Sequence, residues 1–264
     1  MKVYIHTNLG QKKKMALQEE FEKQGIWLFQ RRGFLPLLIL LVGMTLYLYS
    51  EIYPETFFLR GTVYEFYYEI CCLLVGLFGL FIRVYTIGYS AKNTSGRNVK
   101  GQIADRLNTS GLYSLIRHPL YLGNFFMWLG PALLTGNFWF VVAFCFFFWV
   151  YYERIMFAEE QFLRKKFGTA YLYWARKVPA FVPDFRAYQK PVMPFSWKKV
   201  LKQEKNGFFA LFLIFSLFDI IGELTNQKYV FNYFFLFTFV VSGLCFLVLT
   251  YLKRNTTVLD EENR

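Results

Sequence analysis

Long runs of apolar residues dominate the chain, at roughly 34–50, 70–89, 120–134, 138–152, 208–221 and 230–252. An upright helix needs about 17–25 residues to cross a membrane, so the third, fourth and fifth runs are short unless polar turns extend them. The third and fourth runs are joined only by Thr135, Gly136 and Asn137, which predicts a tight hairpin. The pattern predicts an all-α, polytopic membrane bundle of about six transmembrane helices.

Composition and charge agree with a membrane protein. The 264 residues are 55% hydrophobic and 22% aromatic, whereas a soluble domain averages about 45–50% apolar. Lysine and arginine outnumber aspartate and glutamate by 30 to 18, and all the basic residues except Arg60 and Lys228 fall in four segments: 1–33, 83–117, 154–205 and 253–264. Since basic residues collect on the cytoplasmic side, both termini and both long loops are predicted to be cytoplasmic. The expected partner is the lipid bilayer rather than nucleic acid, and no obligate protein partner is indicated.

Four parts of the chain follow from this topology. They are a cytoplasmic N-terminal arm over 1–33, two spans with a polar loop over 34–118, a core of a helical hairpin and a cytoplasmic helix over 119–185, and a linker, two spans and a tail over 186–264. All four cysteines lie inside apolar runs without CxxC spacing, and the chain has two histidines. A disulfide framework and a metal site are therefore not expected.

Residues 111–123 form the first stretch that carries chemistry. Proline suits the first turn of a helix, so the third span is predicted to begin at Pro119, with Arg117 and His118 just outside it. A helix N-terminus offers N–H groups and partial positive charge to a carboxylate or phosphate, and Arg117 adds a bidentate donor. The alternative is that Arg117 anchors the helix among lipid headgroups and His118 caps it.

Residues 153–171 form the second stretch, and we expect them to continue the fourth span into the cytoplasm as a helix ended by Gly168. For Glu160, an ordinary partner is Arg164 at i+4, an exposed pair worth about 0.3–0.5 kcal/mol. Glu159 has no basic residue at i+3 or i+4, which makes it the stronger candidate for binding a ligand cation. Asp219 lies toward the outer end of the fifth span, far from these residues, and is interpreted as structural.

Together these stretches resemble the isoprenylcysteine carboxyl methyltransferase-like group of integral-membrane methyltransferases. The resemblance covers about residues 85–185. It rests on Gly111, Tyr113, Arg117, His118, Pro119, Tyr121, Glu159, Glu160, Leu163, Phe167, Gly168, Tyr171, Val178, Pro179 and Pro183.

The resemblance implies an S-adenosylmethionine-dependent methyltransferase, without a metal, whose pocket lies between the membrane surface and the cytoplasmic loops. By resemblance the cosubstrate is bound by Leu107, Asn108, Tyr113, His118, Pro119, Leu120, Tyr121 and Glu159. The expected catalytic residues are Arg117, Arg154 and Glu160, and the expected substrate-binding residues are Arg97, Arg117 and Arg154. A zwitterionic sulfonium suits such a site, because it needs a carboxylate for its cation and N–H donors for its own carboxylate.

The methyl acceptor is indicated by fewer residues than the cosubstrate. Prenylcysteine methyltransferases carry an arginine where this chain has Ile155, and many bacterial members carry an arginine where it has Ala180. The loop over 92–98 and the tail after Pro183 look closest to bacterial lipid A 1-phosphate methyltransferases of the same superfamily. We therefore predict O-methylation of a membrane lipid phosphate, at the cytoplasmic face of a bacterial inner membrane.

Other functions stay open. Within the methyltransferase class they are carboxyl O-methylation of prenylcysteine and N-methylation of a phospholipid, which needs a base for the acceptor amine. Membrane sterol reductases have a similar Arg-His-Pro half and bind NADPH, but they prefer an asparagine where this chain has Leu120. A non-catalytic lipid-binding or scaffold protein is disfavoured, because both polar motifs converge on one face.

Overall fold

The structure is a computed structural model that describes residues 16–92, 94, 102–227 and 231–261. Within them the regular elements are α-helices and short 3₁₀ turns, with one isolated bridge between Gly111 and Gln189 and no strand. The α-helices are α1 (Leu17–Arg31), α2 (Leu35–Ile52), α3 (Glu65–Gly88), α4 (Pro119–Leu134), α5 (Phe138–Ala175), α6 (Trp197–Thr225) and α7 (Tyr233–Asn255). The predicted all-α fold class is confirmed.

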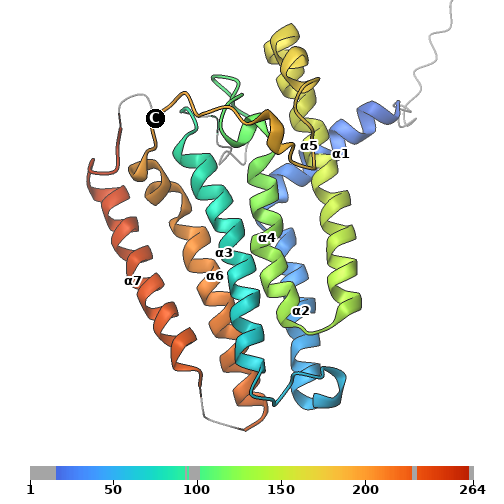
Figure 1. Ribbon diagram of the computed structural model, residues 1–264, viewed down its shortest axis with the longest axis vertical. Coiled ribbons are helices and arrows are strands. Elements are labelled where there is room, and N and C mark those ends of the chain that lie inside the picture. The colour runs from blue at the N-terminus through green and yellow to red at the C-terminus, as the bar shows by residue number, and fades with distance from the viewer. Residues whose placement is uncertain (1–15, 93, 95–101, 228–230, 262–264) are drawn as a thin grey trace, which may run out of the picture.

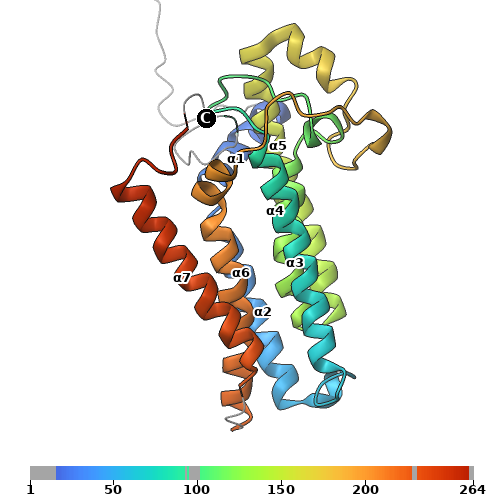
Figure 2. The ribbon, with the colours of Figure 1, turned by 60° about the vertical axis from the view of Figure 1, so that its left-hand side comes forward.

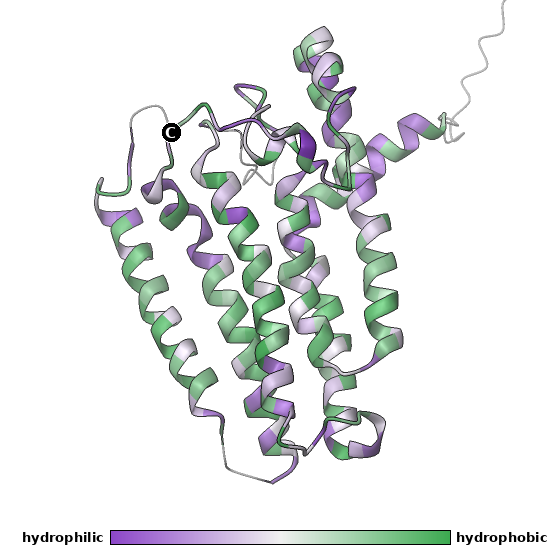
Figure 3. Cartoon of the chain, in the orientation of Figure 1, coloured by the Kyte–Doolittle hydropathy of each residue, from purple (hydrophilic) through white to green (hydrophobic). Residues whose placement is uncertain are grey.

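Helices α2 to α7 form an elongated bundle, and α1 lies across one end of it, packed on α5 (Figure 1; Figure 2). The sides of the bundle are apolar along their middle, and polar residues gather toward its two ends (Figure 3). Four helices, α3, α5, α6 and α7, are long and apolar enough to cross a membrane, and the pair α1–α2, bent by 67°, makes a fifth candidate. The chain is thus a multi-pass membrane protein, while six spans and cytoplasmic termini stay predictions.

Several helix bounds differ from the sequence prediction. The fourth and fifth spans are not short, because polar turns continue α5 to Ala175 and begin α6 at Trp197. Helix α4 does stay short, with 16 residues starting at Pro119 as predicted. Helix α1 falls in the N-terminal arm, where the sequence pattern predicts no element, because its apolar positions are too interspersed with Gln, Glu and Lys to form an apolar run.

Close packing of α3 on α4 depends on glycine. A Cβ on Gly79 would lie 2.4 Å from the carbonyl oxygen of Gly123, and one on Gly130 would lie 2.6 Å from that of Cys72. These contacts are with backbone, which cannot move aside as a flexible side chain can. On the same face of α3, a Cβ on Gly76 would meet Leu211 of α6. Gly76 and Gly79 therefore allow the neighbouring helices to pack closely on α3.

The long connections meet at one end of the bundle. The described residues between α3 and α4, the chain between α5 and α6, and the described C-terminal residues all lie there (Figure 1). The prediction that the two long loops share one face is confirmed. Arg60 belongs to the opposite end, where it pairs with Glu51 at 2.8 Å and with Glu65. At that end Asp219 accepts a hydrogen bond from the backbone N–H of Asn232, which supports its structural interpretation.

Candidate functional site

Hydrogen bonds hold the segment 111–117 against residues 174–189, which form the end of α5 and the chain that follows it. Gly111 has a φ of +63°, in the left-handed region where a side chain is strained, which explains the glycine of the motif. Five hydrogen bonds join the two segments: Gly111 N to Gln189 O (2.9 Å), Gln189 N to Ser114 Oγ (2.9 Å), Arg117 N to Pro179 O (2.9 Å), Asp184 N to Leu115 O (3.0 Å) and Trp174 Nε1 to Tyr113 O (3.2 Å). The two sequence motifs therefore fold as one unit that delivers residues 117–119 to the start of α4.

Gly168 marks a break within α5. Its φ of +52° and ψ of −123° are not helical, so the helix bends there and continues for about two further turns, to Ala175. The predicted end at Gly168 is thus a kink rather than a terminus. Beyond it, Tyr171 and Trp174 pack with Val178 against Leu107 and Tyr113. This small cluster holds the part of α5 beyond Gly168 against the segment around Tyr113.

His118 is the centre of the site. It occupies the N-cap position of α4 but makes no capping hydrogen bond, so the interpretation of His118 as a cap is wrong. Its Nε2 lies 3.0 Å from Glu160 Oε1 and its Nδ1 lies 3.6 Å from Glu159 Oε2. The imidazole is only 5% exposed, and it stacks on the ring of Tyr121 at 5.7 Å.

Burial and charge act in opposite directions on His118. Burial alone would lower the pKa of the imidazole, since it disfavours the charged form. Hydrogen bonds and electrostatic attraction from Glu159 and Glu160 outweigh burial and raise the pKa above its ordinary value. The two carboxylates are therefore bridged by a histidine that favours its charged form.

Arg117 completes this group from the other side of Glu160. Its Nη1 lies 3.2 Å from Glu160 Oε2, so Glu160 has one cationic partner on each oxygen. The alternative partner, Arg164, is not paired with Glu160 among the ion pairs of the described residues. Arg117 also lines the cavity, which favours a role in ligand binding over a simple headgroup anchor.

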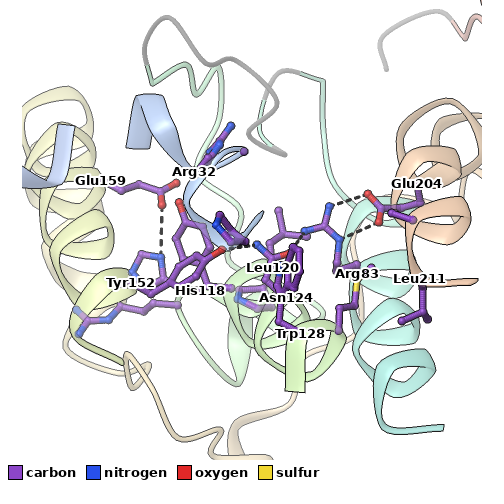
Figure 4. Close-up of a pocket in the computed structure, with 18 of the residues that line it drawn as sticks. Arg32, Arg83, His118, Leu120, Asn124, Trp128, Tyr152, Glu159, Glu204 and Leu211 are labelled. Atoms are coloured by element: carbon purple, nitrogen blue, oxygen red, sulfur yellow. Dashed lines mark hydrogen bonds and ion pairs between the residues drawn. The ribbon is translucent and has the colours of Figure 1, made fainter. Parts of the chain in front are cut away.

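A cavity of about 430 Å³ lies beside this group, between α2, α3, α4, α5 and α6 (Figure 4). Its polar lining residues are Arg32, Arg83, Thr94, Tyr113, Arg117, His118, Tyr121, Asn124, Tyr152, Glu159 and Glu204. Its apolar lining includes Pro36, Pro119, Leu120, Met127, Trp128, Ala210, Leu211 and Ile214. A smaller cavity of about 60 Å³ adjoins it, and the two share Thr94, Tyr113, Arg117, His118 and Glu159.

Most of the predicted site residues meet at these two cavities. Tyr113, Arg117, His118, Pro119, Leu120, Tyr121 and Glu159 line the larger one, and Leu107 and Asn108 line the smaller one. Glu160 lies behind His118 rather than in the cavity lining. Burial raises the pKa of the Tyr113 hydroxyl, so this group enters the site as a neutral hydrogen-bonding group.

The structure does not bring Arg154 to the cavities. Its guanidinium lies 3.6 Å from the centre of the Phe21 ring of α1 and 3.2 Å from Glu153. Its placement on the α1 side of α5 suits docking of α1 better than contact with a ligand. Arg97, the remaining predicted substrate-binding residue, lies outside the described residues.

Sequence reasoning missed a polar network on the far side of the cavity. Arg83 of α3 forms a double hydrogen bond with Glu204 of α6, at 2.8 and 2.7 Å. Arg83 also donates to Asn124 of α4 at 2.6 Å, and Asn124 donates to Tyr152 of α5 at 3.1 Å. In the sequence, Arg83 stands out only as one of the basic residues predicted to be cytoplasmic. The signal in the sequence was an arginine and a glutamate beside apolar runs, since charges at such depth are normally paired.

The start of α4 offers fewer donors than its dipole suggests. Pro119 has no N–H, and the N–H groups of Tyr121 and Leu122 both donate to His118 O. Leu120 is the first-turn residue whose N–H is not used in these bonds, and it lines the cavity. Recognition of an anion here therefore falls mainly to guanidinium groups.

An apolar groove of about 200 Å³ lies on the other side of His118, between α4 and α5. It shares His118, Tyr121 and Tyr152 with the charged cavity, and its other walls are Ile116, Leu122, Phe125, Cys145, Phe148, Trp149, Met156, Ala180 and Phe181. Polar and apolar binding surfaces thus meet at one histidine.

The fold and site define a multi-pass helical membrane protein whose charged cavity, at one end of the bundle, adjoins an apolar groove. Comparison with known proteins shows which proteins the central part of the chain is similar to. Residues 67–170 match the model of the phospholipid methyltransferase family. No solved structure matches the chain.

Two similar proteins are protein-S-isoprenylcysteine O-methyltransferases. The one from Schizosaccharomyces pombe is 34% identical over 101 residues, covering 36% of this chain and 42% of the relative. The one from Saccharomyces cerevisiae is 32% identical over 114 residues, covering 42% of this chain and 47% of the relative. The cobalt-zinc-cadmium resistance protein CzcN of Cupriavidus metallidurans is 33% identical over 91 residues, covering 34% of this chain and 42% of the relative.

The match thus spans less than half the length of each of these relatives. Both comparisons support the resemblance to the isoprenylcysteine carboxyl methyltransferase-like group. The resemblance to lipid A 1-phosphate methyltransferases stays a prediction.

Proposed function

We propose that the chain transfers a methyl group from S-adenosylmethionine to a lipid-linked acceptor at the end of the bundle where the long loops meet. The observation that carries the proposal is the group formed by His118, Glu159 and Glu160. It stands beside a charged cavity and belongs to the segment that is similar to methyltransferases. The distribution of basic residues supports a cytoplasmic location for this end, where a water-soluble cosubstrate is available.

The residues present fit this cosubstrate. Glu159 lines the cavity with a carboxylate for a ligand cation, and Arg117 offers a guanidinium for a ligand carboxylate. The adjoining small cavity is walled by Leu107, Phe162 and Leu163, with the polar side chain of Asn108, which suits a flat heteroaromatic base. Combined, the two cavities fall in the size range of small-molecule sites, about 300–1,000 Å³.

S-adenosylmethionine supplies an electrophilic methyl group on a sulfonium. An acceptor oxygen attacks the methyl carbon in line with the bond to sulfur, which breaks and leaves its electron pair on sulfur. An acceptor that is already an anion needs no general base. The task of the chain is therefore to align the acceptor and to neutralise its charge only in part, since full neutralisation would weaken the nucleophile.

Among acceptors, the carboxylate of a prenylated cysteine has the best support, because similar proteins are named for that reaction. One departure stands against it: Ile155, at the position where we expected the arginine of prenylcysteine methyltransferases, is fully buried. A lipid phosphate such as lipid A 1-phosphate rests on the resemblance of the loop over 92–98 and of the tail after Pro183, and it is the second candidate. Both are lipid-borne oxyanions, and the apolar surfaces within and beside the charged cavity suit a ligand with an apolar chain.

The test uses the full-length protein in lipid nanodiscs with S-adenosylmethionine that carries a deuterated methyl group. Three acceptors are offered in turn: N-acetyl-S-farnesylcysteine, lipid A with a free 1-phosphate, and phosphatidylethanolamine. Mass spectrometry is expected to find the label on an oxygen of the first. Label on the lipid A phosphate would support methyl transfer but make a lipid phosphate the acceptor. Label on the amine of phosphatidylethanolamine would require a general base, and no residue has been assigned that role. Binding of NADPH with no labelled product would overturn the proposal.

A further inference from the structure

Opposite the His118 group, the cavity has a second charged wall. Figure 4 shows Glu159 on one side and the pair formed by Arg83 and Glu204 on the other, with Asn124 and Tyr152 lying between them. Glu204 is only 3% exposed, and both its oxygens accept from Arg83. A double hydrogen bond between guanidinium and carboxylate fixes the plane of the arginine, so the orientation of Arg83 is set by α6.

Arg83 still has donors to offer. A guanidinium has five N–H groups, and the bonds to Glu204 and Asn124 among the described residues use three of them. One N–H on each terminal nitrogen is left, and the side chain lines the cavity with 17% of its surface exposed. Each remaining N–H is a charge-assisted donor held in a fixed plane, suited to an oxygen of a carboxylate or phosphate.

A second arginine reaches the same cavity from the bend between α1 and α2. Arg32 stacks on the ring of Phe29, with its guanidinium carbon 4.0 Å from the ring centre, and it lines the cavity together with Arg83. Below the two arginines the wall turns apolar, through Trp128, Leu211 and Ile214. A cationic rim above an apolar floor suits an anionic head group on an apolar chain.

We propose that Arg83, oriented by Glu204 and Asn124 and assisted by Arg32, binds the oxyanion of the lipid-linked methyl acceptor. The inference rests on the proposed function and adds the acceptor subsite to it. Arg32 and Glu204 both lie outside residues 67–170, the segment that is similar to phospholipid methyltransferases. The cosubstrate side therefore belongs to the shared segment, and the acceptor side is shaped in part by residues outside it.

A purely structural role for Arg83 is the competing explanation, because breaking a buried ion pair destabilises a protein whatever its function. Replacing both partners by apolar residues of similar size removes that penalty. The variants are therefore Arg83→Met, Glu204→Met and the double variant Arg83→Met/Glu204→Met. The control is Arg60→Met, which breaks the ion pairs with Glu51 and Glu65 at the opposite end of the bundle.

Two probes make the charge of the acceptor the variable: N-acetyl-S-farnesylcysteine and its methyl ester, which has the same chain without the oxyanion. Their binding is followed by fluorescence of the full protein in nanodiscs, and the KM of the acid is measured where it is turned over. The intact protein is expected to prefer the acid. In Arg83→Met and in the double variant the KM for the acid should rise at least about tenfold, the loss of one charge-assisted hydrogen bond. The preference for the acid over the ester should also disappear.

Affinity for S-adenosylmethionine should stay near that of the intact protein in all variants, and Arg60→Met should keep the preference for the acid. Recovery of stability together with recovery of acid binding in the double variant would overturn the inference, as would an unchanged preference in Arg83→Met. The same binding measurement with a farnesyl phosphate monoester, compared with the carboxylic acid, shows whether the subsite prefers a phosphate or a carboxylate. If the intact protein transfers no methyl group, the proposed function fails, and the comparison of acid with ester still tests the subsite.

Discussion

Glu159 and Glu160 are neighbours of identical chemistry that the structure assigns to different tasks. Glu160 is bound on both oxygens, by His118 at 3.0 Å and by Arg117 at 3.2 Å, and it lies outside the cavity lining. Glu159 has a longer ion pair with His118, at 3.6 Å, and lines both cavities. The substitutions Glu159→Gln and Glu160→Gln therefore form a matched pair of variants.

Glu159→Gln is expected to lower affinity for S-adenosylmethionine by about 1.5–3 kcal/mol, the range for a hydrogen bond to a charged group, which is roughly 10- to 150-fold in Kd. The lower end is the better expectation, because 30% of the side chain is exposed and water screens the charge. Glu160→Gln should act instead on stability. It removes one charge from a site with two cationic partners and should leave the Kd much less changed.

Isothermal titration with S-adenosylmethionine and with S-adenosylhomocysteine, together with thermal unfolding of each variant, measures both effects. The second ligand lacks the sulfonium charge, so a loss confined to the first ligand places Glu159 beside the sulfonium. An equal loss for both places it beside the ammonium group of the amino acid. If Glu159→Gln binds both ligands as the intact protein does while remaining folded, the assignment of the cavity is wrong.

Three further outcomes are expected. Because the pKa of His118 is raised in the folded state, its stabilising effect should be full below pH ~6.5 and be lost as the pH rises through the raised pKa. Thermal unfolding should therefore show the deficit of His118→Gln shrinking toward alkaline pH, and a deficit independent of pH would contradict this. Gly79→Ala should destabilise the protein, because its Cβ would meet the backbone of Gly123, whereas Gly33→Ala has open space and should be tolerated. The thermal stability of both variants in detergent tests this, and equal stability would refute the packing argument. Arg154→Ala should weaken the docking of α1, seen as faster proteolysis there, without changing the Kd for S-adenosylmethionine; a raised Kd with α1 still protected would return Arg154 to the site.

Local signals in the sequence predicted the parts of the fold that local chemistry determines. Pro119 marks the start of α4 because a proline loses nothing at the first helical position. Asn137 closes the hairpin by accepting a hydrogen bond from the N–H of Phe140 at 2.9 Å. Gly168 interrupts α5 because its φ is positive. Each of these positions acts through its own backbone conformation and neighbours.

What depends on distant contacts was not predictable in the same way. Arg83 and Glu204 are 121 positions apart, and only the packing of α3 on α6 brings them together. Helix α1 escaped notice because it is stabilised by its contact with α5, where a Cβ on Gly25 would lie 2.1 Å from Arg154 O, rather than by an apolar run of its own. Arg32 was not predictable as a site residue, because it reaches the cavity only through the position of α1, which it directly follows.

The meeting of a charged cavity with an apolar groove at His118 has a kinetic consequence for the proposed reaction. One reactant of the proposed reaction arrives from three-dimensional solution, and the other diffuses within a two-dimensional sheet. The concentration that governs the second is its mole fraction among the surrounding lipids. Adding inert lipid at constant total acceptor should therefore slow turnover by surface dilution, while the response to the water-soluble reactant stays the same. The methylated product and the spent donor also leave into different phases, so removal of one does not draw off the other.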